Sequence, residues 1–299
     1  GERVKTKYLD WMTQKTLKHL KDVRKYSPVK SNMDFILLSG DIVNFANCYN
    51  DWKEWNQCRA FGEYAIAPVA GNKEFYKLID ESSQQKMRNY SPEWFLDNVN
   101  IPENGPGGVD STYWFIYNNV LFISLCNCQE YSPNNKIPVN NEYVLSSQKK
   151  WFKDVVTGAK GKYDYIVVQT HYPYFSNEVE GGCICTWGSY EEWRDIFDEF
   201  KVDFALCGDY HEYLRSFPLE GDKAVKSGGT IYVTFPLIPY EPWELAVLEG
   251  NDKRVAKRSF RGAMGFGIFK VTEEKMVFSL LNFDGEVADE VEVVKKDRT

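Results

Sequence analysis

The chain has 299 residues, of which 43% are hydrophobic, 16% aromatic and 26% charged, and its net charge is −7. This composition excludes a disordered chain and allows a large folded core. No dense Lys/Arg run provides the basic surface of a nucleic-acid binder, and no apolar run reaches the roughly 20 residues that span a bilayer.

The first two thirds of the chain alternate between helical and strand patterns. Residues 7–25 repeat apolar side chains at helical spacing, and residues 33–38 form a short apolar run typical of a buried strand. The Asn118-Asn119 pair between two β-rich runs indicates a hairpin. The predicted helices are 7–25, 51–64, 74–90, 142–157 and 191–200, and the predicted strands are 33–38, 65–69, 113–117, 120–125, 163–169 and 202–207.

The remainder of the chain is predicted to be mostly β. Strand patterns lie at 212–217, 230–235, 265–271, 275–281 and 286–294, and Asp284-Gly285 is a good hairpin turn. Alternation followed by strands predicts an α/β fold, a four-layer α/β/β/α sandwich of two mixed sheets flanked by helices. We expect one domain over 1–299, with the α/β part at about 1–207 and the β-rich part at about 208–299.

Two segments are predicted to lie on the surface as loops. Residues 97–111 are rich in Asn, Pro and Gly, and the basic stretch 253–261 has the composition of a solvated loop. Together with the 176–188 loop, a set of tryptophans provides candidate contacts to a partner, although each one fits helix–sheet packing better. These tryptophans are Trp52, Trp55, Trp94 and Trp187.

The seven cysteines bear on the cellular compartment. They are Cys48, Cys58, Cys126, Cys128, Cys183, Cys185 and Cys207. Cys207 lies in an apolar strand and is predicted to be a buried thiol. Three close pairs favour bridges in a secreted, lysosomal or other oxidising compartment, while a reduced intracellular protein fits the same spacing. The Cys-x-Cys spacing argues against structural zinc.

Polar residues follow four of the predicted parallel strands. They are Asp41 after 33–38, Asn72 after 65–69, His171 after 163–169, and Asp209 with His211 after 202–207. Open α/β sheets place their sites at this edge, and carboxylate, amide and imidazole groups together suit a divalent metal. Only three histidines exist in the chain, and two of them end strands, so the sequence predicts a site of metal-binding origin. His19 fits a solvated helix surface.

These motifs, in this order, resemble the calcineurin-like metallophosphoesterases. The segments GDIVN, PVAGNKE, VVQTHYP and CGDYHEYLRSFP match successive signatures of that family. The last segment is most similar to the purple-acid-phosphatase branch and its Gly-His-x-His-x-Tyr-x-Arg-x-x-Pro pattern, which Tyr213, Arg215 and Pro218 fit. The helix SSQKKWFKDVV and the tail MGFGIFKVTEEKMVFSLLNFDGEV also resemble that branch, so the likeness covers nearly the whole chain.

The resemblance implies a metal-dependent phosphoester hydrolase. In that family two metal ions bridged by an aspartate activate a water and stabilise the transferring phosphoryl group, with a histidine as general acid. It implies that Asp41 bridges the metals, that Asn72 and His171 hold the second metal, and that His211 holds the first. The substrate would be a phosphoester. The sequence does not determine the oligomeric state.

Three departures from the family pattern affect this site. The family's first strand, ending in Asp, would precede residues 7–25 and therefore lie upstream of Gly1 or be absent. Lys73 occupies the position of the general-acid histidine, where it cannot trade protons as imidazole does and opposes metal binding by charge repulsion. Asp209 replaces the first histidine of the last motif, although a carboxylate can still coordinate a metal.

The departures predict at most one complete site. It would consist of Asp41, Asn72, His171 and Asp209 and would hold a divalent ion such as Mn, Zn, Fe or Ca. Asn44 stands where the purple branch has its tyrosine, which argues against a ferric–tyrosinate centre. A second hypothesis is that the Lys73 ammonium replaces a metal and pairs with Asp41 and Asp209, since a buried ionic network is tolerated when its members are satisfied.

The leading functional hypothesis is a metallophosphoesterase-fold protein with lost or reduced hydrolase activity, a pseudoenzyme that acts by binding a protein partner or within an assembly. The alternative is an active metal-dependent phosphatase or phosphodiesterase completed by ligands upstream of residue 1. A scaffold without any ligand site is the third possibility. Lys73 and Asp209 favour the first hypothesis, because truncation explains neither.

Overall fold

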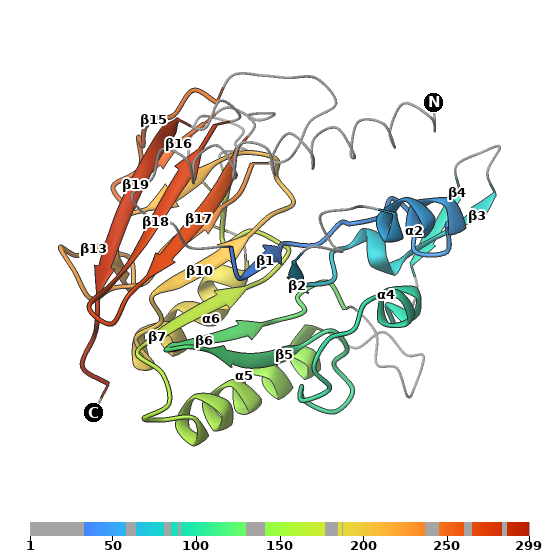
Figure 1. Cartoon of the computed structure of the whole chain (residues 1–299), viewed down its shortest axis with the longest axis horizontal. Helices are drawn as coiled ribbons and strands as arrows, with labels where there is room; N and C mark the ends of the chain where they lie inside the picture. The colour runs from blue at the N-terminus through green and yellow to red at the C-terminus, as the bar shows by residue number, and fades with distance from the viewer. Residues whose placement is uncertain are drawn as a thin grey trace.

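The computed structural model describes a mixed α/β molecule built around one large sheet (Figure 1). The described residues are 33–57, 64–80, 85–88, 91–129, 141–176, 185–186, 188–236, 245–259, 265–282 and 286–298. The strands of the large sheet are β5 (Tyr113–Tyr117), β6 (Val120–Ser124), β7 (Tyr165–Gln169), β10 (Phe204–Cys207), β11 (Leu214–Ser216), β14 (Ile231–Thr234), β15 (Leu248–Glu249) and β16 (Val255–Arg258). Their spatial order is β15-β16-β11-β14-β10-β7-β6-β5.

The remaining strands form smaller sheets. β1 (Phe35–Leu38) pairs in parallel with β2 (Ala65–Pro68), and β17 (Phe266–Val271), β18 (Lys275–Leu281) and β19 (Val287–Val294) form an antiparallel sheet. Three two-stranded pieces are β3 (Tyr76–Asp80) with β4 (Gln85–Arg88), β8 (Phe175–Ser176) with β9 (Cys185–Thr186), and β12 (Leu219–Glu220) with β13 (Lys223–Ala224). The described helices are α2 (Tyr49–Asn56), a 3-10 turn η1 (Lys73–Phe75), α4 (Glu93–Asn98), α5 (Asn141–Gly158) and α6 (Gly188–Glu199).

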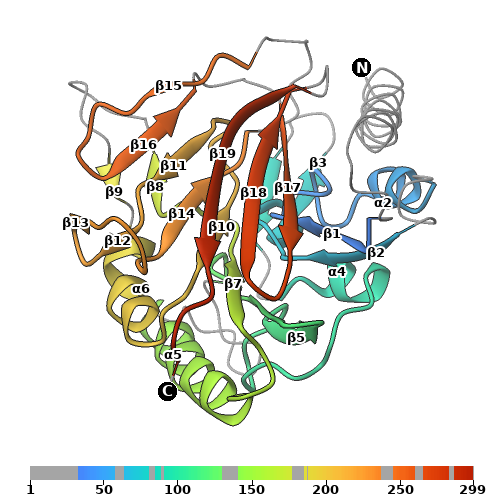
Figure 2. The same cartoon turned by 60° about the vertical axis from the view of Figure 1, so that its left-hand side comes forward.

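The two faces of the large sheet bury different partners because side chains alternate along each strand. On one face, Ile166 and Val168 of β7 pack with Phe152 of α5 and Trp193 of α6. On the other, Val167 joins a cluster with β18 and the partly buried side chains of β1. Figure 1 shows α5 below the large sheet and β17–β19 at the upper left, and in Figure 2 β17–β19 lie in front of β7 and β10, with α5 and α6 at the lower left. The confirmed fold is therefore mixed α/β, with the second sheet present as the separate β1–β2 and β17–β19 groups.

A third apolar cluster packs α2 and α4 against the β1–β2 sheet. Trp52 and Trp55 of α2 are 4% and 5% exposed and pack with Phe95 and Val99. These two tryptophans therefore serve helix packing, as the packing interpretation predicted, and provide little exposed contact surface. Trp94 is half-buried beside them. Trp187 lies outside the described residues.

Two sequence predictions are wrong, and each has a physical cause. The described part of the expected 74–90 helix is not helical beyond η1, which is followed by the antiparallel strands β3 and β4. The Asn47 side chain binds both backbone groups of Leu78: its Oδ1 accepts the Leu78 N–H at 2.7 Å, and its Nδ2 donates to the Leu78 carbonyl at 2.9 Å. These two hydrogen bonds hold the segment extended. The stretch 253–261 was predicted to be a solvated loop because it is rich in charged residues, but it contains the strand β16, whose Val255 and Ala256 are buried.

Several other sequence predictions can be compared with the structure. The hairpin at Asn118-Asn119 is confirmed as β5–β6, and α4 is a helix that the pattern did not predict. Cys207 is a buried thiol as expected, and Cys126 is a buried thiol not bridged to its neighbour Cys128. The 7–25 helix and the Asp284-Gly285 turn lie outside the described residues. Within the described ranges, every helix is too short or too polar to cross a membrane.

Candidate metal site

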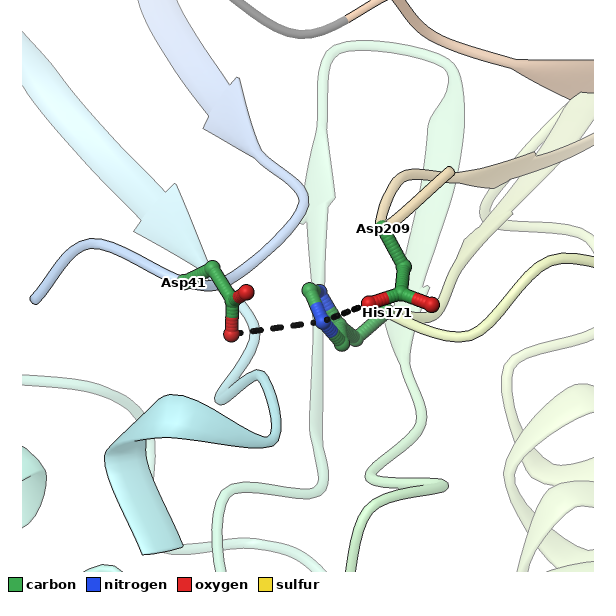
Figure 3. Close-up of side chains that lie close together, drawn as sticks. All are labelled: Asp41, His171 and Asp209. Atoms are coloured by element: carbon green, nitrogen blue, oxygen red, sulfur yellow. Dashed lines mark ion pairs between the residues drawn. The ribbon is translucent and has the colours of Figure 1, made fainter. Parts of the chain in front are cut away.

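The polar residues singled out by the sequence follow the strands of two parallel pairs. β1 and β2 are parallel to each other, and β7 and β10 are parallel neighbours in the large sheet. Asp41 follows β1, His171 follows β7 and Asp209 follows β10, so three loops present their side chains to one another (Figure 3). One ligand atom from each of the three lies within 4.8 Å of the others. The predicted convergence at this sheet edge is therefore present for these three residues.

The backbone bends sharply to present the two carboxylates. Asp41 and Asp209 have positive φ angles of 56° and 67°, which L-residues rarely adopt and which cost about 1 kcal/mol or more each. Gly40 before Asp41 has φ 89°. A Cβ on Gly71 would lie 2.4 Å from both the backbone nitrogen and Oδ1 of Asp41, so only glycine lets the two loops approach. Strain of this kind gathers at functional sites.

His171 lies between the two carboxylates. Its Nε2 is 3.3 Å from Oδ1 of Asp41 and 3.3 Å from Oδ1 of Asp209, and the side chain is 1% exposed (Figure 3). Its Nδ1 lies 2.5 Å from the carbonyl oxygen of Ser39. Because a carbonyl only accepts hydrogen bonds, Nδ1 carries a proton and donates a hydrogen bond to the Ser39 carbonyl. In this tautomer Nε2 carries a lone pair and lies close to two negative oxygens.

This arrangement requires a positive species between the three groups. A lone pair facing two carboxylates at 3.3 Å is repulsive unless Nε2 holds a proton or the three atoms share a cation. Burial lowers the pKa of His171, but the nearby carboxylates of Asp209 and Asp41 and the Ser39 carbonyl together raise it above its ordinary value. With the imidazole neutral, one nitrogen and two carboxylate oxygens fit a single divalent ion.

Glu74 organises the loops without facing the cluster. It is fully buried, and its carboxylate accepts the backbone N–H groups of Asp41 at 2.9 Å, Val43 at 3.1 Å and Gly71 at 2.6 Å. Burial and then the charge of Asp41 raise its pKa to about 7, against the lowering effect of its hydrogen bonds. The β1 and β2 loops are therefore fixed to each other by one side chain.

Lys73 brings a positive charge to the same carboxylate. Its backbone N–H donates to Oδ1 of Asp41 at 3.0 Å, and its ammonium lies 3.4 Å from Oδ2. The side chain is 37% exposed, so the ammonium reaches Asp41 from the solvent side. Among the described residues the ion pair of Lys73 is with Asp41, while Asp209 pairs with His171. The predicted Lys73–Asp41 pair is thus present, and a Lys73–Asp209 pair is not seen in the described part of the chain.

Two further predicted ligands occupy different situations. Asn72 has a buried Oδ1 without a partner among the described residues, which leaves one oxygen available to a cation. His211 is not part of the described Asp41–His171–Asp209 cluster, although it shares their positive φ, at 56°. The metal-binding role of all five residues stays a prediction.

Sequence reasoning missed two residues that position His171. The Oδ1 of Asn127 accepts the backbone N–H groups of His171 and Tyr172 at 3.2 and 3.0 Å, and Ser39 holds the imidazole. Asn127 follows β6, which lies parallel beside β7. The available signal was a polar residue, Asn127, after a buried strand.

The bent loops and the carboxylate–imidazole cluster give this α/β fold a candidate metal site at the carboxyl ends of its parallel strands. The model of the calcineurin-like phosphoesterase family matches residues 11–213. The chain therefore belongs to the calcineurin-like phosphoesterase family, as its motifs predicted. An uncharacterized protein of Mycobacterium tuberculosis is 26% identical over 200 residues, covering 62% of this chain and 35% of the relative. The chain thus spans about a third of that protein's length.

Solved structures share the fold at low sequence identity. A purple acid phosphatase from yellow lupin seeds aligns with a TM-score of 0.58 and 15% identity, over 94% of this chain and 48% of its own. GAP50, the anchor in the inner membrane complex of Plasmodium, aligns with a TM-score of 0.55 and 16% identity, over 94% of this chain and 83% of its own. A dimetal phosphatase from Danio rerio aligns with a TM-score of 0.51 and 13% identity, over 93% of this chain and 87% of its own. At these identities the likeness concerns the fold alone.

Proposed function

We propose that this chain is a metallophosphoesterase-fold protein whose phosphoester hydrolysis is lost or strongly reduced, and that it acts by binding or within an assembly. The observation that carries the proposal is the Lys73 ammonium 3.4 Å from Oδ2 of Asp41. A fixed positive charge there competes with a divalent ion for the same carboxylate. Lys73 also stands where the family pattern has its general acid, so the leaving group lacks an imidazole proton donor.

A second observation supports the same proposal. Asp41, His171 and Asp209 satisfy one another if Nε2 of His171 is protonated, since it lies 3.3 Å from both carboxylates. A cluster of two carboxylates, an imidazolium and an ammonium balances two negative charges with two positive ones. The site is then stable without a metal, and no nucleophilic water is activated. A role within an assembly has a parallel on this fold in GAP50, the anchor in the inner membrane complex of Plasmodium.

The alternative function is a working metal-dependent phosphatase. It is favoured by the orphaned Oδ1 of Asn72 and by the fit of one divalent ion to Asp41, His171 and Asp209. A bound ion would supply Lewis-acid activation of water and phosphate. In that case Asp41, His171 and Asp209 hold the ion, Ser39 and Asn127 orient the imidazole, and Glu74 fixes the Asp41 loop.

The two functions are separated by a hydrolysis assay on the full-length protein. We expect p-nitrophenyl phosphate turnover with added Mn²⁺ or Zn²⁺ to equal that of the Asp41→Asn variant, because the site lacks a general acid. Metal analysis of the purified protein is expected to find less than one ion per chain. Turnover that disappears in Asp41→Asn, or two stoichiometric metals, would defeat the proposal and establish the phosphatase.

A further inference from the structure

A groove between α2 and α4 lies apart from the Asp41–His171–Asp209 cluster, and its lining includes none of the cluster's residues. Its volume is about 460 Å³, within the range of ligand sites of roughly 300–1,000 Å³. In Figure 1 the two helices lie side by side at the edge of the molecule that also carries β3 and β4. Of the described lining residues, half bear a side-chain carboxamide, three are aromatic and the remaining one is Lys53.

Contacts within the protein hold the residues that line the groove in place. Trp52 is 4% exposed and donates its indole N–H to the carbonyl of Ala46 at 2.6 Å. The Asn56 amide donates to Oδ1 of Asn98 at 3.2 Å, which ties α2 to α4. The Lys77 ammonium lies 4.5 Å from the centre of the Trp94 ring, a cation–π contact that orients this indole. A pre-formed wall lowers the ordering cost of binding.

Other groups in the groove remain available to a ligand. The side chains of Tyr49 and Gln57 make no hydrogen bond to other described residues. Tyr49 is 76% exposed, although it is a large aromatic residue. Each carboxamide can donate and accept at once, and each hydroxyl can do the same. The groove therefore combines flat apolar rings with paired donors and acceptors.

The chemistry of the lining narrows the class of ligand. No described lining residue carries a carboxylate, so a metal or other cation has no ligand of opposite charge. Lys53 is the single charged group in the described lining, which is too little for a polyphosphate or nucleic acid. A purely apolar ligand would cover the Gln57 carboxamide and the Tyr49 hydroxyl without offering either a hydrogen bond, at a cost. A hydroxyl-rich ring with an apolar C–H face satisfies both kinds of lining.

We propose that the α2–α4 groove is a saccharide-binding site. The sugar's C–H face packs on the Tyr49 and Trp94 rings, and its hydroxyls exchange hydrogen bonds with Asn56 and Gln57. The Lys53 ammonium donates a hydrogen bond to a ring oxygen or pairs with an acidic substituent of the sugar. The site goes beyond the proposed function and does not depend on the metal cluster, because it shares no side chain with it.

Saturation-transfer difference NMR on the full-length protein tests the site with N-acetylglucosamine, galactose, mannose and glucuronic acid, each at millimolar concentration. We expect saturation transfer to at least one of these sugars. Tyr49→Ala and Gln57→Ala should each weaken the affinity, by about tenfold for the aromatic residue, near the upper end for one aromatic contact. Both residues are exposed, so the variants should keep the wild-type unfolding temperature.

Phe217→Ala is the matched control, since Phe217 is a 42% exposed aromatic residue outside the groove, and it should bind as the wild type does. Absence of transfer to all four sugars overturns the proposal. So does transfer that Tyr49→Ala and Gln57→Ala leave unchanged. Inorganic phosphate is the anion probe: phosphate binding lost in Lys53→Ala, without sugar binding, would assign the groove to an anion and overturn the saccharide site.

Discussion

Two buried ionic clusters in this molecule are built from similar groups and differ in how well they are satisfied. In the first, Arg215 of β11 donates from Nε and Nη2 to the two oxygens of Asp289 on β19, at 2.6 and 2.9 Å, and Tyr213 donates to the same carboxylate at 2.6 Å. In the second, His171 meets two carboxylates at 3.3 Å and leaves Nε2 without a hydrogen bond within the described residues.

The difference separates a structural network from a site. The Tyr213–Arg215–Asp289 cluster fastens the β17–β19 sheet to the large sheet by bidentate pairing, and it needs nothing further. The Asp41–His171–Asp209 cluster uses strained backbone and lacks one positive charge unless a proton or a cation supplies it. Burial and charge alone do not mark a functional site, whereas unsatisfied atoms on strained loops do.

The largest effect is expected from breaking the satisfied cluster. Arg215→Met leaves Asp289 buried, at 4% side-chain exposure, without its cation. We expect the free energy of unfolding to fall by about 3–5 kcal/mol, the usual cost of removing one member of a buried pair. Urea unfolding measures it. Arg194→Met is the control, because its pairs with Glu191 and Asp222 are exposed and contribute at most about 1 kcal/mol. Equal losses in the two variants would contradict the structural role.

A smaller effect is expected at the residue that supports the second cluster. Glu74→Gln replaces one acceptor oxygen by an NH₂ group facing the backbone N–H groups of Asp41, Val43 or Gly71. Leaving one or two of these donors unpaired should cost about 1–3 kcal/mol in urea unfolding. Glu199→Gln, which loses only an exposed pair with Lys153, should cost less than about 1 kcal/mol. An unchanged midpoint in Glu74→Gln would mean that the carboxylate does not hold these loops.

The sequence predicted the positions of these clusters better than their internal contacts. Strand ends could be located because apolar runs ending in Gly or a polar residue mark parallel strands, and the side chains of Asp41, His171 and Asp209 after such strands lie close together. Arg215 belongs to a sequence motif, but its partner Asp289 lies 74 residues away and no local pattern joins them.

The missed features share a physical cause. The helix expected at 74–90 gave way to a hairpin because a distant side chain, Asn47, pairs with the backbone of Leu78. Glu74 and Asn127 bind backbone N–H groups of other loops, and such long-range side-chain contacts leave no periodic signal in the sequence. Propensity and pattern report on near neighbours, so the supporting residues of a site are what they omit.

The smallest effect sharpens the comparison at its centre, the positive charge beside Asp41. Lys73→Ala removes an ammonium 3.4 Å from Oδ2 and leaves the backbone donation of residue 73 to Oδ1 intact. Because the side chain is 37% exposed, solvent screens it, and we expect Mn²⁺ to bind about tenfold more tightly, near 1.4 kcal/mol. Isothermal titration calorimetry at neutral pH measures the change. Lys150→Ala, which removes an exposed ammonium beside Asp154, should leave Mn²⁺ affinity unchanged. If Lys73→Ala binds Mn²⁺ no better than the wild type, the ammonium does not compete with a metal, and a proton on His171 remains as the charge that balances the cluster.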